Sequence, residues 1–429
     1  MSSTRDKKQA EVLDIYFKAN PQRCTLVLST SFGKSKVAID IIKRMNPPKV
    51  LILANSVDLR DSVWRFEFLS WGMKEYYENN VETATYQKAT KWRPDKKDIP
   101  PSTLIIADEV DFAGGTEEMS KFFSRYPENK VVGLTGFITE AKKIWFGFNM
   151  PVLYEYSAEL AQEEGVLNHI KFTFVKFNIS RDPKSNTVKY GSGKSFTQSE
   201  NDSYRYAEKK YLEAAANRAK LENFMATEGG LSMEEYIRKK RALTHAVNRA
   251  AKVRRELLVD MDSTAAVARK IVEYIHSTPN KKTIVFSKRV AQSVKACGIK
   301  NVYNKDIPKK ELERRMTNFM EGASDLLGVC DKVNRGSNIP DLYNAVLETY
   351  FGSDTKAVQR FGRLMRLEAD EVANAFILLP YYLEETESGT YVSEPTQQVH
   401  WARSMLRSTD VKHSSVWDYR AVKTEKPNE

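Results

Sequence analysis

Two apolar segments of the chain end in residue types that can bind a nucleoside triphosphate and its metal. Thr25–Ser29 runs into Thr30-Ser31-Phe32-Gly33-Lys34-Ser35, and much later Leu104–Ala107 runs into Asp108-Glu109-Val110-Asp111. A glycine-containing loop after a strand can turn its backbone N–H groups and Lys34 toward phosphates. Ser35 and Asp108 offer oxygen ligands to Mg²⁺, and Glu109 can orient the attacking water. The pattern predicts a site for ATP and Mg²⁺.

A second Gly-Lys-Ser sequence lies in a different setting. Gly191-Ser192-Gly193-Lys194-Ser195 follows a polar stretch without an apolar strand, and no convincing helix begins after it. Without a strand before it and a helix after it, the loop does not gather N–H groups around a phosphate. We therefore interpret residues 181–203 as a loop or hairpin insertion with Lys194 near its tip.

Short apolar runs alternate with helical patterns in two separate parts of the chain. Nearly continuous apolar runs are typical of parallel strands that are buried on both faces. The expected strands are Cys24–Ser29, Val50–Ala54, Glu82–Tyr86, Thr103–Ala107, Val131–Leu134, Thr283–Ser287, Leu326–Cys330, Ala345–Thr349 and Ala375–Leu379. The expected helices between them are Lys34–Met45, Leu59–Trp71, Lys309–Met320 and Thr355–Arg363. The predicted fold class is α/β, with two tandem parallel-sheet domains.

The segment between these two parts predicts long charged helices, Asn201 to Asp260, broken at Gly229-Gly230. From Met233 to Leu258 one stripe at helical spacing is apolar and the stripe beside it is basic. The apolar stripe consists of Tyr236, Leu243, Val247, Ala250 and Leu257; the basic stripe consists of Arg238, Arg241, His245, Arg249, Lys252 and Arg255. The basic stripe is either a solvated helix face or a second grip on duplex or branched DNA.

Composition and charge limit the kinds of protein to which this chain can belong. The chain has 429 residues, of which 41% are hydrophobic, and a formal net charge of +11. Residues 181–260 alone carry a net charge of +6 from 17 basic and 11 acidic residues, which favours a polyanionic partner. The polar N-terminus is unlike a secretory signal, and no apolar run approaches the roughly eighteen residues that a membrane span needs. Scattered Cys24, Cys297 and Cys330 favour reduced thiols and a cytoplasmic location.

The order of motifs resembles superfamily two helicases and translocases, above all the compact phage branch-migrating helicases of the UvsW kind. The resemblance covers roughly Gln9 to Pro380. Its motifs, from I to VI, lie at Leu28–Ser35, Leu59–Phe68, Thr83–Gln87, Asp108–Asp111, Leu134–Thr139, Lys282–Ser287, Gly328–Pro340 and Gln359–Arg366, and Ala158–Leu167 resembles the acidic helix that leads into the second motor domain.

The resemblance implies two RecA-like domains and assigns roles to single residues. The implied domains are residues 1–155 and 156–385, the second with a basic helical insertion at about 200–262, followed by an extension at 386–429. The implied nucleotide contacts are Gln9, Thr30, Ser31, Phe32, Gly33, Lys34, Ser35, Gly336 and Asn338. Besides Lys34 and Glu109, the implied catalytic residues are Gln359, Arg363 and Arg366. The two arginines lie three apart, so on a helix they share one face, where either can meet transition-state charge between the domains.

Nucleic-acid contacts are expected at strand ends of both domains and on the insertion. Hydroxyl, amide and guanidinium groups suit the phosphate backbone, which holds any sequence equally well. The candidates are Arg60, Thr85, Tyr86, Gln87, Ser287, Lys288, Arg335, Ser337, Arg238, Arg241, Arg249 and Lys252.

The resemblance implies an ATP-dependent DNA helicase or translocase that acts as a monomer on forks, displacement loops or junctions in recombination, repair or replication. Three alternatives remain open: an RNA helicase or remodeller of the same fold, a duplex translocase that separates no strands, and a non-motor scaffold with a degraded nucleotide site. Intact Lys34, Ser35, Asp108 and Glu109 argue against the last of these.

Overall fold

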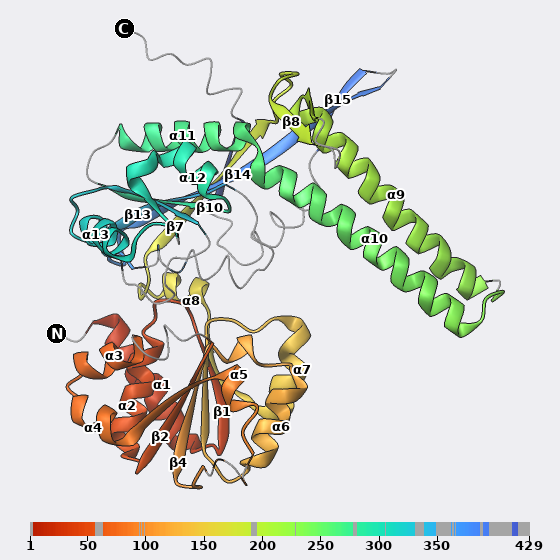
Figure 1. The fold of residues 1–429 in the computed structure, drawn as a ribbon. Coiled ribbons are helices and arrows are strands. Elements are labelled where there is room, and N and C mark those ends of the chain that lie inside the picture. The colour runs from red at the N-terminus through yellow and green to blue at the C-terminus, as the bar shows by residue number, and fades with distance from the viewer. Residues whose placement is uncertain are drawn as a thin grey trace. The chain divides into compact units, whose positions relative to one another are not determined.

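The structure is a computed structural model that describes residues 3–55, 63–93, 95, 97, 99–189, 195–227, 229–277, 281–304, 306–330, 339–348, 362, 364, 366–386, 389–393 and 414–418. The chain divides into two units. Unit 1 comprises residues 1–170, 333–341 and 355–373, and unit 2 comprises the remainder. Figure 1 shows the elements of both units.

Unit 1 contains a parallel sheet in the order β3-β2-β4-β5-β1-β6. Its strands are β1 (Arg23–Leu28), β2 (Lys49–Ala54), β3 (Val81–Thr85), β4 (Thr103–Asp108), β5 (Val131–Thr135) and β6 (Val152–Tyr156). The central strands are buried along most of their length, as expected of a sheet with helices on both faces.

Helices cover the sheet of unit 1 on its two faces (Figure 1). They are α1 (Thr4–Ala19), α2 (Lys34–Met45), α3 (Trp64–Ser70) and α4 (Lys74–Asn80) on one face, and α5 (Tyr86–Ala89), α6 (Glu117–Arg125) and α7 (Glu140–Asn149) on the other; η2 (Val110–Phe112) and α8 (Ala158–Glu163) complete the unit. An aromatic core that includes Phe122, Phe123 and Phe146 lies beneath α6 and α7.

Unit 2 contains a second, larger sheet in the order β11-β12-β10-β13-β14-β7-β16, with β15 paired to β14. Its strands are β7 (His169–Asn178), β10 (Lys282–Ser287), β11 (Val302–Tyr303), β12 (Leu326–Cys330), β13 (Leu342–Leu347), β14 (Val372–Thr386), β15 (Gly389–Ser393) and β16 (Ser414–Asp418). The pairs from β11 to β14 and the pair β7–β16 are parallel, whereas β15 runs antiparallel to β14.

The helices of unit 2 form a cover and a projecting arm. The covering elements are α11 (Asp262–His276), α12 (Val290–Cys297), η3 (Ile299–Asn301) and α13 (Lys309–Met320). Two long helices, α9 (Glu200–Thr227) and α10 (Met233–Asp260), lie side by side and antiparallel, and we call them the helical arm (Figure 1). A short hairpin of β8 (Asn186–Lys189) and β9 (Ser195–Gln198) precedes the arm.

The predicted fold class, two parallel-sheet α/β domains, is confirmed. The bounds of α2 and α13 agree with the sequence expectation, and the arm is broken around Gly229 and Gly230 as expected. Tyr86 was expected to end a strand, but it begins α5 because the Thr85 hydroxyl caps that helix. The helix expected at Thr355–Arg363 lies outside the described residues. Among the described residues, every helix is too short or too polar to cross a membrane.

Candidate active site

The strand order of unit 1 brings three loops to one edge of the sheet. β1 lies beside β5, and β5 lies beside β4, so the loops that follow their carboxyl ends are neighbours. Ligands of open parallel sheets bind outside this edge. The loops carry Thr30 to Gly33, Asp108 to Asp111 and Thr135 to Phe137.

The loop after β1 has a backbone shaped for phosphate. Ser31 (φ 70°) and Gly33 (φ 96°) lie in the left-handed region. No side chain caps α2, which begins at Lys34, so its first-turn N–H groups are left for a ligand. The buried Gln9 braces the loop, because its Nε2 donates to the Phe32 carbonyl at 2.7 Å. A Cβ on Gly33 would lie 2.5 Å from that nitrogen, so only glycine fits here.

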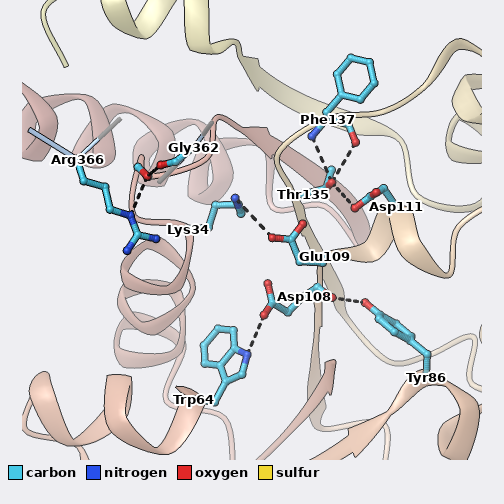
Figure 2. A network of polar contacts seen from close by, with 11 residues as sticks. Lys34, Trp64, Tyr86, Asp108, Glu109, Asp111, Thr135, Phe137, Gly362 and Arg366 are labelled. Atoms are coloured by element: carbon cyan, nitrogen blue, oxygen red, sulfur yellow. Dashed lines mark hydrogen bonds and ion pairs between the residues drawn. The ribbon is translucent and has the colours of Figure 1, made fainter. Parts of the chain in front are cut away.

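Lys34, Asp108 and Glu109 converge at this edge (Figure 2). Lys34 Nζ lies 3.9 Å from Glu109 Oε1, and both side chains are largely buried. Glu109 adopts a left-handed backbone (φ 48°), a strained conformation for a residue other than glycine and one that is frequent at functional sites. Burial and the Glu109 carboxylate raise the pKa of Asp108 above its usual range, whereas Lys34 and a hydrogen bond from Trp64 lower it.

Asp111 links the loop after β4 to the loop after β5 (Figure 2). The Thr135 hydroxyl donates to Asp111 Oδ1 at 2.7 Å, and Lys142 of α7 donates to the Asp111 carbonyl. Burial and Glu109 raise the pKa of Asp111 to about 6. The two loops are therefore tied together by buried polar contacts, which resist independent movement.

Arg366 lies against the phosphate loop within unit 1. Its Nε donates to Ser31 Oγ at 3.1 Å, and that hydroxyl donates to the Gly362 carbonyl (Figure 2). A Cβ on Gly362 would lie 2.3 Å from Thr30 Oγ1, so the close approach of the two segments requires glycine. Burial lowers the pKa of Arg366, and the Glu67 carboxylate of α3 opposes that shift.

The residues present fit a magnesium nucleotide. Three carboxyl groups, those of Asp108, Glu109 and Asp111, lie near two lysines, Lys34 and Lys142, so the cluster favours additional positive charge. Among the described residues no group of three or more His, Cys, Asp or Glu could by itself hold a metal ion. Mg²⁺ commonly uses one or two carboxylates together with substrate phosphates. Asp108 and the Ser35 hydroxyl would hold it.

The candidates for nucleic-acid contact differ in exposure. Gln87 is exposed and Lys288 is half-buried, whereas the Thr85 hydroxyl accepts from the Lys88 N–H as a helix cap. Tyr86 and Ser287 are buried, with 2% and 1% of their surface exposed. The Tyr86 phenol donates to the Asp108 carbonyl at 2.8 Å, so in this structure it supports the strand end and is not presented to solvent.

The two stripes of α10 occupy different environments. The residues of the apolar stripe are half-buried beside α9, whereas Arg238, Arg241, Arg249 and Lys252 are exposed. The base of the arm is held by a buried ion pair, in which Arg254 Nη1 lies 3.0 Å from both carboxylate oxygens of Glu208. The Arg254 guanidinium also lies 3.7 Å from the centre of the Tyr211 ring.

Several predicted site residues lie outside the described residues: Arg60, Arg335, Gly336, Ser337, Asn338, Gln359 and Arg363. Lys194 of the second Gly-Lys-Ser sequence also lies outside them. The sequence interpretation also missed contacts. It assigned no role to Trp64, Thr135 or Lys142, although Trp64 lies within the motif at Leu59–Phe68 and Thr135 within the motif at Leu134–Thr139. A polar or indole side chain inside a motif was the signal available for these two.

Comparisons with known proteins agree with this architecture. Residues 266–368 match a model described as the helicase conserved C-terminal domain. The fold is similar to the helicase domain of Hef from Pyrococcus furiosus, with 17% identity and a TM-score of 0.50 over 92% of this chain and 97% of that one. It is also similar to LlaBIII, an ATP-dependent Type ISP restriction-modification enzyme bound to DNA, with 14% identity and a TM-score of 0.56. That match covers 97% of this chain but 31% of LlaBIII. No curated protein sequence matches the chain.

At these identities the likeness to the two solved structures shows a shared fold. The match to the helicase conserved C-terminal domain adds a family resemblance over residues 266–368.

Proposed function

We propose that this chain is a DNA-stimulated ATPase that translocates on DNA and unwinds branched substrates such as forks, displacement loops and junctions. One observation carries the proposal: Lys34, Asp108 and Glu109 converge beside a phosphate loop on which Arg366 is seated. These are the charges that phosphoryl transfer from ATP to water requires.

Each residue has a role that follows from its chemistry. Lys34 and the first-turn N–H groups of α2 neutralise phosphate charge. Ser35 and Asp108 hold Mg²⁺, which supplies further positive charge to the phosphates when bound. Glu109 orients the attacking water, and Arg366 stabilises the charge that develops in the transition state, with Arg363 and Gln359 as further candidates. Gly336 and Asn338 contribute nucleotide contacts, and Gln9 braces the loop that holds the phosphates through its bond to the Phe32 carbonyl.

The nucleic acid is bound by phosphate contacts at strand ends and by the arm. The exposed guanidinium groups of α10 suit a polyanion, and they belong to unit 2, whereas the nucleotide loop belongs to unit 1. A second basic surface favours a branched substrate over a single strand, because a junction offers two duplexes to hold. The DNA-bound state of the similar LlaBIII enzyme supports DNA as the polymer.

The test is the steady-state ATPase rate of the full chain with Mg²⁺, without polymer and with single strand, duplex, fork, four-way junction and RNA. We expect the rate to rise most with the fork and the junction. If RNA stimulated the ATPase rate as much as DNA or more, the proposed polymer would be RNA and not DNA. ATPase with triplex displacement but without fork unwinding would identify a duplex translocase. No turnover on any polymer would overturn the proposal.

A further inference from the structure

Asp108 is held from two sides by buried aromatic donors. Trp64, with 1% of its surface exposed, donates its indole N–H to Asp108 Oδ2 at 3.0 Å. Tyr86 donates to the backbone carbonyl of the same residue at 2.8 Å (Figure 2). Trp64 begins α3, which follows β2 in the chain, and Tyr86 begins α5, which directly follows β3. β2 lies beside β4, and β3 lies on the other side of β2.

The contact of Trp64 differs from that of Tyr86 because it engages the carboxylate itself. A buried indole N–H needs an acceptor, and here the acceptor is one oxygen of the residue assigned to Mg²⁺. Because Oδ2 accepts the indole N–H, the side-chain rotamer of Asp108 is fixed. Oδ1 is then the carboxylate oxygen that the indole does not contact. Groups that orient a metal ligand in this way commonly change metal affinity by about 10- to 100-fold when removed.

Packing explains why the indole is fixed in this place. Trp64 and Phe68 lie four residues apart on α3, so both point from one face of the helix, and both are fully buried. Their ring centres are 6.3 Å apart, and Phe68 in turn packs on Tyr77 of α4 at 5.2 Å. The indole therefore cannot leave Asp108 without disturbing this aromatic row.

We propose that Trp64 is a positioning residue for the metal site: its N–H orients the Asp108 carboxylate for Mg²⁺. The inference rests on the proposed function, because it assumes that Asp108 is the metal carboxylate. It assigns to α3 a part in nucleotide binding beyond packing.

The test compares Trp64→Phe with Trp145→Phe in the full chain. Trp145 is a matched control, because its Nε1 also donates to a side chain, the Ser120 hydroxyl at 2.7 Å, on the α6–α7 side of the sheet. N-methylanthraniloyl-ADP binding is measured by fluorescence during a Mg²⁺ titration and again in EDTA. We expect Trp64→Phe to raise the half-saturating Mg²⁺ concentration by about 10-fold or more, with unchanged affinity in EDTA. Trp145→Phe should change neither quantity.

A second variant separates the hydrogen bond from packing. Benzothienylalanine at position 64 keeps the ring shape and replaces the N–H by sulfur, so it should reproduce the Mg²⁺ shift even where Trp64→Phe fails to fold. An unchanged Mg²⁺ midpoint with this side chain would overturn the inference, as would an equal loss of affinity in EDTA. If the parent protein itself bound the nucleotide without any dependence on Mg²⁺, the proposed function would fail instead.

Discussion

At the scale of single residues, the secondary structure around a motif matters more than its exact sequence pattern. The sequence around Lys34 departs from the strict phosphate-loop pattern, whereas the sequence around Lys194 is rich in glycine. Lys34 nevertheless follows β1 and begins α2, where it lies beside Glu109. Lys194 directly precedes β9 of a two-stranded hairpin.

This contrast predicts opposite effects of the same substitution. Lys34→Ala removes the cation beside Glu109 and should lower the ATPase kcat by roughly 10²- to 10³-fold. Lys194→Ala should stay within about twofold of the parent, as expected of a change outside the site. Steady-state ATPase assays with saturating DNA measure both. A large loss in the Lys194 variant would assign the phosphate site to the hairpin instead.

Arg366 provides the second residue-scale prediction. Because its guanidinium lies on the phosphate loop, Arg366→Ala should lower kcat by roughly 10³-fold and change nucleotide affinity much less. Arg44→Ala is the control, since Arg44 pairs with Asp14 at the exposed end of α2. Single-turnover hydrolysis and fluorescent-nucleotide binding separate the two effects. A loss confined to binding would leave Arg366 as a binding residue without a role in the transition state.

Residue identities in the site were predictable, but their partners were not. Lys34, Asp108 and Glu109 follow apolar strands, so their position at the sheet edge could be inferred from the sequence. The bond from Trp64 to Asp108 depends on how α3 packs, which no local pattern encodes. Tyr86 was predicted as a nucleic-acid contact at a strand end, but packing buries it, and its hydroxyl donates to the Asp108 carbonyl.

At the scale of elements, α10 is a helix with one packed and one open face. Replacing Arg238, Arg241 and Arg249 by Glu should weaken fork binding and reduce the slope of log affinity against log salt by about two to three. Replacing exposed Lys209, Lys220 and Lys310 by Glu makes the same change in net charge on α9 and α13. Equal effects of the two triple variants in fluorescence anisotropy would show that net charge, and not this face, determines binding.

The base of the arm depends on a buried ion pair. Arg254→Met leaves the Glu208 carboxylate buried without its cation and should destabilise this region by about 3 to 5 kcal/mol. The double change Glu208→Leu with Arg254→Met removes both charges and should recover most of that stability. Hydrogen exchange at the amides of α9 and α10 measures the local effect. Unchanged exchange in the single variant would mean that the pair does not stabilise the arm.

Elements were predictable where one periodicity dominates the sequence. The amphipathic repeat of α2 and α13 and the apolar runs of β10 and β12 specify them locally. β7 and β16 were missed, because their pairing partners lie far away in the chain. β14 was predicted too short, although β13 and β15, which pair with it, lie near it in the sequence. Pairing of β16 with β7 joins residues 414–418 to residues 172–176, a contact that only the folded sheet provides.

At the scale of the whole molecule, each unit has its own core, so the stability of each can depend on groups far from the ATP site. In unit 2, Glu348 directly follows β13 and is 2% exposed, and among the described residues its Oε1 has no hydrogen-bond partner. Burial raises the pKa of Glu348 to about 8, and a contact with Ser287 opposes this shift only in part. The folded unit therefore retains a proton that the unfolded chain releases near its ordinary pKa.

The sign of the pH effect follows from this difference. Between about pH 4.5 and pH 8 the folded state binds more protons than the unfolded state, so the contribution of Glu348 to stability falls as pH rises through this window. Glu348→Gln is neutral at every pH and removes this loss. We expect the variant to gain stability relative to the parent as pH rises from 5 to 9, by several kcal/mol in all, since each unit of the pKa shift corresponds to about 1.4 kcal/mol. Urea unfolding of the two proteins at matched pH measures the difference, since other titrating groups cancel in the comparison. A stability difference that stays constant from pH 5 to pH 9 would mean that Glu348 titrates at its ordinary value and that its carboxylate reaches solvent or a cation.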